Sequence, residues 1–243
     1  MTSTSAKMEA VSAEAPRRNR LTSGGLIGKI LTYTVLVFWA VLVIFPMVWS
    51  IMSSFKTDQE IFFSPWALPK VLMWENFARA WVKARIGAYL FNTLLIILPS
   101  LFFTLLLSAM ASYVLARFEF RGRQFITYLF LLGMIFPIFL GLVPLYFLMQ
   151  KLALLDTYHG LILVYIAFSL SFTIFFLTNF FRTLPKELGE AATIDGASQY
   201  DIFFQVYLPL AQPGLVTMGI FNFLGQWNQY ILPNTLKIGR AHV

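Results

Sequence analysis

Cysteine is absent from this chain of 243 residues, and histidine occurs only twice, at His159 and His242. Without cysteine the protein cannot contain a disulfide framework, a thiolate nucleophile or a sulfur-ligated metal. Two histidines far apart in the sequence also lack the close spacing of a histidine metal cluster. We therefore expect no metal site.

Charged residues are scarce as well. They make up 12% of the chain, against about 25% in soluble domains. Hydrophobic residues make up 58% and aromatic residues 17%, which is more apolar surface than one soluble core can hide, so membrane lipid must be part of the solvent. The net charge of +7 does not indicate nucleic-acid binding, because the basic residues cluster at the ends of apolar runs.

Five stretches carry no charged residue and are long enough to cross a bilayer. A membrane helix needs about 20 apolar residues, and inside lipid every backbone polar group must be satisfied within its own segment. The sequence therefore predicts an all-α membrane protein, a polytopic helical bundle with five spans. The five stretches are Ile30–Phe55, Ile86–Ala116, Gln124–Gln150, Gly160–Phe181 and Leu210–Leu236.

The third stretch contains Pro137, Gly141 and Pro144. Each proline removes a helix hydrogen bond and clashes with the preceding turn. The pattern predicts either a kinked helix or a broken helix of the kind that lines a transport path.

The basic residues give the expected orientation. With the N-terminus in the cytoplasm, ten Lys and Arg residues fall inside and six outside, and the short loop "RFEFRGR" at 117–123 gives the strongest local indication. We expect residues 1–25 to be a disordered cytoplasmic tail. Residues 26–85 should hold the first span and an extracytoplasmic loop, and residues 86–237 the membrane core.

Aspartate and glutamate are absent from the five apolar stretches, and no G-x-x-x-x-G-K-[ST] loop is present. An ion relay through the membrane would use intramembrane acids, and a P-loop nucleotide site would use the glycine-rich motif. The spans also hold no convincing catalytic dyad. We expect a chain that is not an enzyme, binds no cofactor and takes any energy for transport from another subunit.

A polar insert, "TLPKELGEAATIDGASQYDIFFQVYLP", separates the last two apolar stretches. Pro185 suits the first position of a short helix, where a missing N–H costs nothing. Asp195 and Gly196 form a turn pair in which the glycine is expected at positive φ. The insert therefore begins with a short helix that ends at a glycine corner.

A second short helix follows the corner. Ser198 and Asp201 have the spacing of a capping box ahead of an apolar run, and Leu208–Pro209 is expected to end that helix. The first helix should expose a ridge of Ala191 and Ala192 with Glu190 beside it. Small side chains let another backbone approach closely, so the insert is either a docking element for a partner or a plain connector.

The insert resembles the motif of ABC-importer permeases, in which Glu-Ala-Ala is followed by Gly, Ile and Leu-Pro at fixed spacings. Flanking stretches such as "RFEFRGR" and "QWNQYILP" are similar to those of carbohydrate-uptake permeases, specifically the maltose-type inner subunit with a short N-terminus. The resemblance extends from Leu26 to Lys237. The motif residues are Glu190, Ala191, Ala192, Gly196, Leu208 and Pro209, with Val206 where the motif favours isoleucine.

This resemblance implies a permease subunit of an ATP-driven importer, located in the plasma membrane of a prokaryote, that moves a sugar or oligosaccharide by alternating access. It implies a second homologous permease subunit, a cytoplasmic ATPase dimer and an extracytoplasmic solute-binding protein as partners. The insert would be the ATPase-coupling loop, with Glu190, Ala191, Ala192, Asp195, Gly196, Leu208 and Pro209 as its residues. Two alternatives stay open: a permease for another small solute, and a membrane receptor or scaffold whose cytoplasmic loop binds a partner.

Several polar residues are candidates for the translocation path. Aromatic faces and amides suit a sugar, but polar side chains also hold helix bundles together through interhelical hydrogen bonds. Both interpretations stay open, because the partner permease could hold the sugar instead. The candidates are Asn92 in the second stretch and Gln226, Trp227, Asn228 and Gln229 in the last one.

The end of the chain departs from the family that it resembles. Permeases of that subclass have six spans with both ends inside, whereas five are visible in this sequence. The final residues 238–243, "IGRAHV", do not resemble the start of a sixth span. Our hypothesis is that the core is incomplete at its C-terminus and that residues 238–243 are not native.

Overall fold

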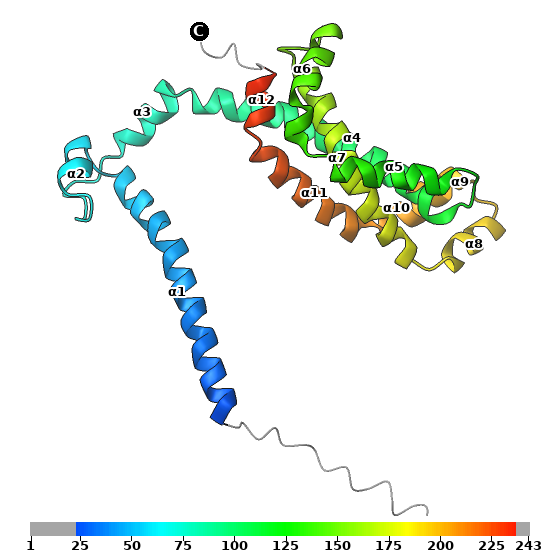
Figure 1. The fold of residues 1–243 in the computed structure, drawn as a ribbon, viewed down its shortest axis with the longest axis horizontal. Helices are drawn as coiled ribbons and strands as arrows, with labels where there is room; N and C mark the ends of the chain where they lie inside the picture. Colours follow the sequence, from blue (N-terminus) through cyan, green and yellow to red (C-terminus); the bar gives the residue numbers. More distant parts are fainter. Residues whose placement is uncertain (1–22, 237–243) are drawn as a thin grey trace, which may run out of the picture. The chain divides into compact units, whose positions relative to one another are not determined.

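In a computed structural model, the described part of the chain, residues 23–236, consists of helices and the loops that join them, without a strand among those residues (Figure 1). The predicted all-α class is confirmed. The chain divides into two compact units, Met1–Ala84 and Arg85–Val243, each with its own helices. Most of the tail expected at 1–25, and the residues 238–243 that we expected not to be native, lie outside the described part.

The first unit begins with the long helix α1 (Ser23–Ser54). The helix starts at Ser23, so the last residues of the expected tail are helical instead. Its apolar side chains are exposed along the whole span, with none of the span buried inside the unit. A helix of this length and composition satisfies its own backbone and leaves its side chains to lipid or to another subunit.

A buried lysine organises the loop that follows α1. Lys56 is only 2% exposed, and its ammonium group donates to the carbonyl oxygens of Ser64 at 3.1 Å and Pro65 at 2.8 Å. These carbonyls follow the short helix α2 (Asp58–Phe63). From α3 (Glu75–Lys83), Asn76 donates to the carbonyl oxygens of Ser54 and Lys56. The loop is therefore tied to the end of α1 by side-chain to backbone hydrogen bonds.

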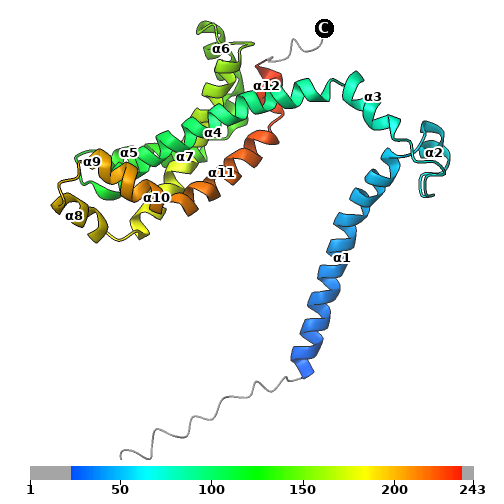
Figure 2. The ribbon, with the colours of Figure 1, turned by 180° about the vertical axis from the view of Figure 1, so that it is seen from behind.

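The second unit is built around α4 (Ile86–Arg117) and α7 (Tyr158–Thr183), which lie side by side in both ribbon views (Figures 1 and 2). The buried face of α4 carries a small hydroxyl residue at every fourth position, and the Ser112 hydroxyl donates to the Ile174 carbonyl of α7 at 3.1 Å. Small residues at this spacing let two membrane helices approach closely. The four residues, each 0% exposed, are Ser100, Thr104, Ser108 and Ser112.

The third apolar stretch is broken rather than gently kinked. Helix α5 (Arg123–Ile135) is followed by its C-cap Phe136, and η2 (Ile138–Gly141) and α6 (Leu142–Lys151) continue at an angle of 92°. Phe136 has an extended backbone, with ψ at 118°, as expected for a residue before proline. Pro137 therefore sets the break, which makes this pair either a broken span or a re-entrant loop.

The number of membrane crossings stays a prediction. Three helices in the described part are long and apolar enough to cross, and a fourth crossing is added if the bent pair is one span. The last predicted stretch is not one helix, because α11 (Gln212–Trp227) stops and α12 (Ile231–Thr235) follows after a gap. At that point the Asn228 side chain and its backbone N–H both donate to the Leu224 carbonyl of the preceding turn.

Candidate functional site

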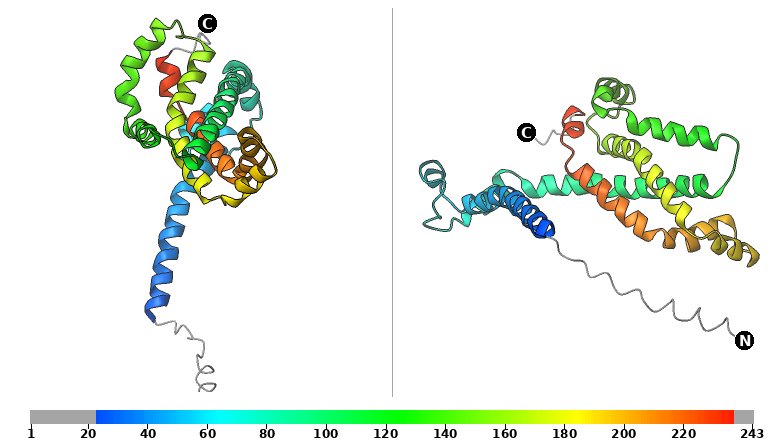
Figure 3. Two further views of the ribbon diagram at one scale, coloured as in Figure 1. Left: turned by 90° about the vertical axis from the view of Figure 1, so that its right-hand side faces the viewer. Right: turned by 60° about the horizontal axis from the view of Figure 1, so that its bottom comes forward.

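The polar insert forms a compact group of short helices at one end of the second unit, where α7 finishes and α11 starts (Figure 3). Its first helix is α8 (Glu187–Ile194). Gly196 has φ of +84°, as the sequence predicted. The Gly196 N–H donates to the Thr193 carbonyl and the Ala197 N–H to the Ala192 carbonyl. This pair of bonds is a Schellman motif, which ends α8 and fixes the corner.

The predicted capping box is also present. The Ser198 hydroxyl accepts from the Asp201 N–H, and the Asp201 carboxylate accepts from the Ser198 N–H at 3.1 Å. The hydrogen bonds from Ser198 lower the pKa of Asp201 below its ordinary value. The box starts α9 (Gln199–Asp201), so the direction in which the chain leaves the corner is set by local hydrogen bonds.

Two expectations about prolines were wrong. Helix α8 begins at Glu187 with Lys186 as its N-cap, so Pro185 lies before the helix rather than at its first position. Leu208–Pro209 does not end the second helix, because α9 continues as the π-helix η3 (Ile202–Tyr207) into α10 (Leu208–Leu210). The Leu208 N–H donates to the Phe203 carbonyl. In that register the next donor would be the nitrogen of Pro209, which carries no hydrogen, so the π turn ends there.

The expected ridge of two alanines is only half correct. Glu190 and Ala191 are exposed, but Ala192 is half-buried and packs with Ala197 against the core of the unit. The exposed surface of the insert instead includes a large apolar side chain, Ile194, which is 86% exposed. Tyr200 is 75% exposed on the neighbouring helix. Exposed apolar side chains beside an acid are typical of an interaction surface.

A tyrosine that sequence analysis did not single out anchors α8 to the unit. Tyr207 is 3% exposed, and its hydroxyl donates to the Pro185 carbonyl at 3.2 Å. Gly189 packs directly on it, since a Cβ at this position would lie 2.7 Å from the Tyr207 hydroxyl oxygen. Only glycine therefore fits on the face of α8 that lies against Tyr207. The glycine in the middle of such a short helix was the sequence signal for this contact.

An arginine ties this tyrosine to the long helices. The guanidinium of Arg117, the last residue of α4, lies 4.4 Å from the centroid of the Tyr207 ring. It also donates to the carbonyl oxygens of Phe181 at 2.9 Å and Leu184 at 2.8 Å, where α7 ends. One side chain thus joins the ends of α4 and α7 to the residue on which α8 rests. We call Gly189, Tyr207 and Arg117 the anchor cluster.

The candidate path residues separate into different environments. Gln226 is 6% exposed; its side-chain oxygen accepts from the Ser100 hydroxyl at 2.5 Å and its amide donates to the Ser169 hydroxyl at 3.2 Å. Nearby, Asn222 donates to the Thr173 hydroxyl at 3.0 Å. Gln226 therefore has the partners expected of a residue that links α4, α7 and α11.

The other candidate path residues are less buried. The Trp227 ring stacks on Phe223 with centroids 5.4 Å apart, and Trp227 is 40% exposed. Asn228 is exposed, and Gln229 and Asn92 are half-buried. The structure thus brings Trp227, Asn228 and Gln229 together at the end of α11, whereas Asn92 lies on another helix, α4.

The second unit thus carries an exposed loop, anchored to its long helices, between α7 and α11. Comparison with known proteins supplies the class of protein. Residues 105–241 match the family model described as "Binding-protein-dependent transport system inner membrane component". The chain is 52% identical over 207 residues to the diacetylchitobiose uptake system permease protein NgcG of Streptomyces coelicolor, a match that covers 85% of this chain and 68% of the relative.

Two further comparisons also find ABC-transporter proteins. The chain is 33% identical to the trehalose transport system permease protein SugB of Mycobacterium tuberculosis, over 85% of this chain and 77% of the relative. Its fold is similar to that of a chain in the crystal structure of a bacterial ABC transporter involved in the import of the acidic polysaccharide alginate. That similarity has a TM-score of 0.80 at 24% identity and covers 89% of this chain and 78% of the other.

The chain therefore belongs to the family of binding-protein-dependent transport system inner membrane components. It is a permease subunit of an ABC importer and not itself an enzyme, since ATP is hydrolysed by a separate subunit of such transporters. Because the chain belongs to this family, it is located in a membrane and functions together with an ATPase and a solute-binding protein.

Proposed function

We propose that the chain imports a carbohydrate across the plasma membrane as one of two homologous permease subunits, with a cytoplasmic ATPase dimer and an extracytoplasmic sugar-binding protein. The observation that carries the proposal is the 52% identity to a diacetylchitobiose permease over 85% of the chain. The trehalose relative supports the same class of solute. The transported solute is then a sugar or oligosaccharide.

In this proposal the insert at 187–209 is the docking element for the ATPase. The exposed side chains of Glu190, Ala191 and Ile194 give α8 a mixed acidic and apolar surface, which suits a groove on a protein partner. A helix of eight residues is too short to be stable alone and draws its stability from packing.

The anchor cluster supports a mechanical role for the insert. Movement of the ATPase would push on α8, and Gly189 rests on the Tyr207 hydroxyl without an intervening side chain. Tyr207 contacts Arg117, which belongs to α4 and binds the carbonyl groups at the end of α7. A displacement of α8 would thus reach both long helices through close contacts, which are stiff because packed interiors are dense.

The orientation follows from the same proposal. The insert and the Arg117–Arg123 loop lie in the cytoplasm, and α2 and α3 lie outside. The excess of basic residues on the side assigned to the cytoplasm supports this orientation.

Uptake of labelled solutes into vesicles tests the proposal. The chain would be co-reconstituted with its partner permease, ATPase and binding protein, and accumulation of a labelled chito-oligosaccharide, a labelled disaccharide and a labelled amino acid compared. We expect ATP-dependent accumulation of a sugar and none of the amino acid. Accumulation of the amino acid alone would show that the solute class is wrong, while the family assignment would stand.

A further inference from the structure

The loop between α1 and α3 folds back along the end of α1, and α2 lies beside that end in both ribbon views (Figures 1 and 2). The Trp66 ring stacks on the Phe45 ring and contacts the Trp49 ring, in each case with centroids 5.8 Å apart. The Trp49 indole N–H donates to the Pro65 carbonyl at 3.0 Å. Residues 62–68, which we call the loop tip, are therefore held beside the last turns of α1.

The contacts of Trp66 give the depth of the loop tip in the membrane. The candidate span Gly25–Ser54 has 30 residues, or about 45 Å at 1.5 Å per residue, which matches a bilayer of about 40–45 Å with its headgroups. The hydrocarbon core of about 30 Å then begins roughly 7 Å before Ser54, close to Trp49. Because Trp66 contacts both Phe45 and Trp49, the tip lies where headgroups meet acyl chains.

The loop tip presents large apolar side chains outward. Phe62 is 81% exposed, Phe63 86% and Leu68 79%. Charged residues lie on either side of the tip, at the base of the loop, where Asp58 and Lys70 are both exposed. The loop thus has a polar base and an apolar, aromatic tip, which is the distribution expected of a segment at a membrane interface.

The backbone of the tip is satisfied by side chains of the same unit. The carbonyl oxygens of Ser64 and Pro65 accept from the buried ammonium group of Lys56, and the Pro65 carbonyl also accepts from Trp49. A carbonyl in water needs no such partner, whereas one at the edge of the hydrocarbon must find it within the protein. The buried lysine and the indole therefore suit irregular chain placed where water is scarce.

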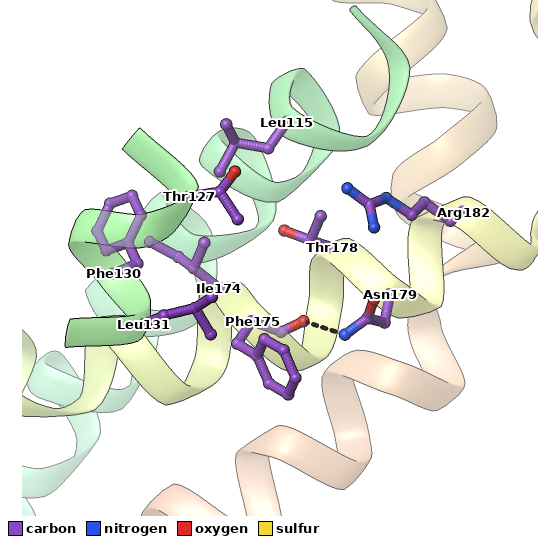
Figure 4. Close-up of a pocket in the computed structure, with 9 residues that line it drawn as sticks. All are labelled: Leu115, Thr127, Phe130, Leu131, Ile174, Phe175, Thr178, Asn179 and Arg182. Carbon is purple, nitrogen blue, oxygen red and sulfur yellow. Dashed lines mark hydrogen bonds between the residues drawn. The ribbon is translucent and has the colours of Figure 1, made fainter. Parts of the chain in front are cut away.

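Exposed apolar surface alone does not identify what covers it. Figure 4 shows an example in the second unit, a pocket with Phe130 and Leu131 of α5 and Ile174 of α7 in its lining. Its walls are regular helices, which satisfy their own backbone whatever covers them. The loop tip differs, because its depth and its internally satisfied carbonyls both point to the same surroundings.

We propose that the loop tip inserts into the membrane leaflet at the C-terminal end of α1, with Phe62, Phe63 and Leu68 among lipid chains at the headgroup boundary. A span of another subunit would be the other apolar partner at this depth. Interfaces between membrane helices favour small residues that allow close approach, whereas the tip carries large rings. The inference requires α1 to span the membrane and depends neither on the transported solute nor on the orientation of the chain.

Labelling of introduced cysteines tests the insertion, since the chain has no cysteine of its own. Single cysteines in place of Phe63 and Leu68 would be treated with a membrane-impermeant thiol reagent in intact and in opened cells. Gln59, which is exposed at the base of the same loop, is the matched control. We expect position 59 to react and positions 63 and 68 to react only after denaturation. The proposal is overturned if positions 63 and 68 react as readily as position 59.

A photo-cross-linking amino acid in place of Phe63 identifies what covers the tip in intact membranes. We expect a mass increase equal to one phospholipid. Trp66→Ala should release the tip from α1, reduce this adduct and expose a cysteine at position 68 to the reagent, whereas Trp81→Ala, which removes an exposed tryptophan of α3, should change neither. A cross-link to another polypeptide, or an adduct that Trp66→Ala leaves unchanged, would overturn the proposal.

Discussion

At the scale of single residues, Gly189 decides how closely the insert can approach the membrane helices. A Cβ at this position would lie 2.7 Å from the Tyr207 hydroxyl oxygen and 3.0 Å from a ring carbon, and the tyrosine is buried and cannot move aside. We expect Gly189→Ala to destabilise the insert by about 1–3 kcal/mol, the usual cost of overpacking, and to lower transport. Thermal unfolding and uptake of the reconstituted complex would measure both effects.

Two controls separate a clash from a change in helix propensity. Gly225→Ala lies in α11 with no atom within 4 Å of the added Cβ, so it should be neutral or slightly stabilising. Tyr207→Phe removes the oxygen that Gly189→Ala meets, so the double variant should recover part of the lost stability. If Gly189→Ala changes stability and transport no more than Gly225→Ala does, the close contact between Gly189 and Tyr207 is not needed for either.

Gln226 is the candidate path residue whose environment points to a structural role. Gln226→Leu leaves the Ser100 and Ser169 hydroxyls without this partner, and we expect it to cost about 0.6–2 kcal/mol of stability. Transport rate should fall only as the amount of folded complex falls, with the apparent affinity for the solute unchanged. A changed order of preference among sugars in uptake assays would instead place Gln226 at the solute.

At the scale of elements, the corner of the insert was predictable from sequence because its determinants are local. Gly196 and the Ser198–Asp201 box set the backbone conformation only of the residues next to them in the sequence. Both are present as expected. The anchor cluster was not predictable, because Arg117 and Tyr207 are far apart in the sequence and meet only through packing. The continued helix past Pro209 was missed for a related reason: a π turn, not recognisable from periodicity, accommodates the proline.

The capping box makes the start of α9 sensitive to acid. Because hydrogen bonds from Ser198 hold the pKa of Asp201 below 3.8, its contribution to stability is complete above that pH and is lost as pH falls through the lowered folded-state pKa. Ser198→Ala should move the Asp201 pKa back toward 3.8. Hydrogen exchange of the α9 amides should then be faster, and the loss of protection on acidification should begin at a higher pH.

Thr193→Ala is a suitable control for this experiment. Its hydroxyl donates only to the Gly189 carbonyl within α8, so the acid response of α9 should be unchanged. Equal exchange in the Ser198→Ala variant and the parent chain would mean that the box does not hold α9.

At the scale of the whole molecule, the orientation of the chain in the membrane can be determined by labelling introduced cysteines, because the chain has no cysteine of its own. Single cysteines in place of Gln59, Glu119 and Ser198 would be treated with a membrane-impermeant thiol reagent on intact cells. We expect labelling at position 59 only, and labelling of all three after the cells are opened. External labelling at position 198 would place the insert on the wrong side for an ATPase and contradict the proposed topology.

The number of spans illustrates what sequence patterns leave undetermined at this scale. Charge-free length predicted five spans, but one stretch is bent by 92° at Pro137 and another is divided between α11 and α12. Hydropathy measures only whether a segment is apolar enough to enter lipid. The path of the backbone within the membrane also depends on single residues such as Pro137, which has no N–H to donate to a helix hydrogen bond.

The central claim is that residues 187–209 couple the membrane helices to an ATPase, and retention of the ATPase by the membrane complex tests it most directly. Gly196→Pro cannot adopt the φ of +84° at the corner, and Ala191→Trp places a large side chain on the exposed face of α8. Two further variants serve as controls. Gly196→Asn introduces a residue that tolerates positive φ, and Ala78→Trp places a large side chain at an exposed alanine of α3.

We expect all four variants to reach the membrane at the level of the parent chain. Gly196→Pro and Ala191→Trp should lose the bound ATPase together with binding-protein-stimulated ATP hydrolysis and uptake, whereas Gly196→Asn and Ala78→Trp should keep the ATPase. If Gly196→Pro and Ala191→Trp both retain the ATPase and support uptake, the insert is only a connector and the coupling role is wrong.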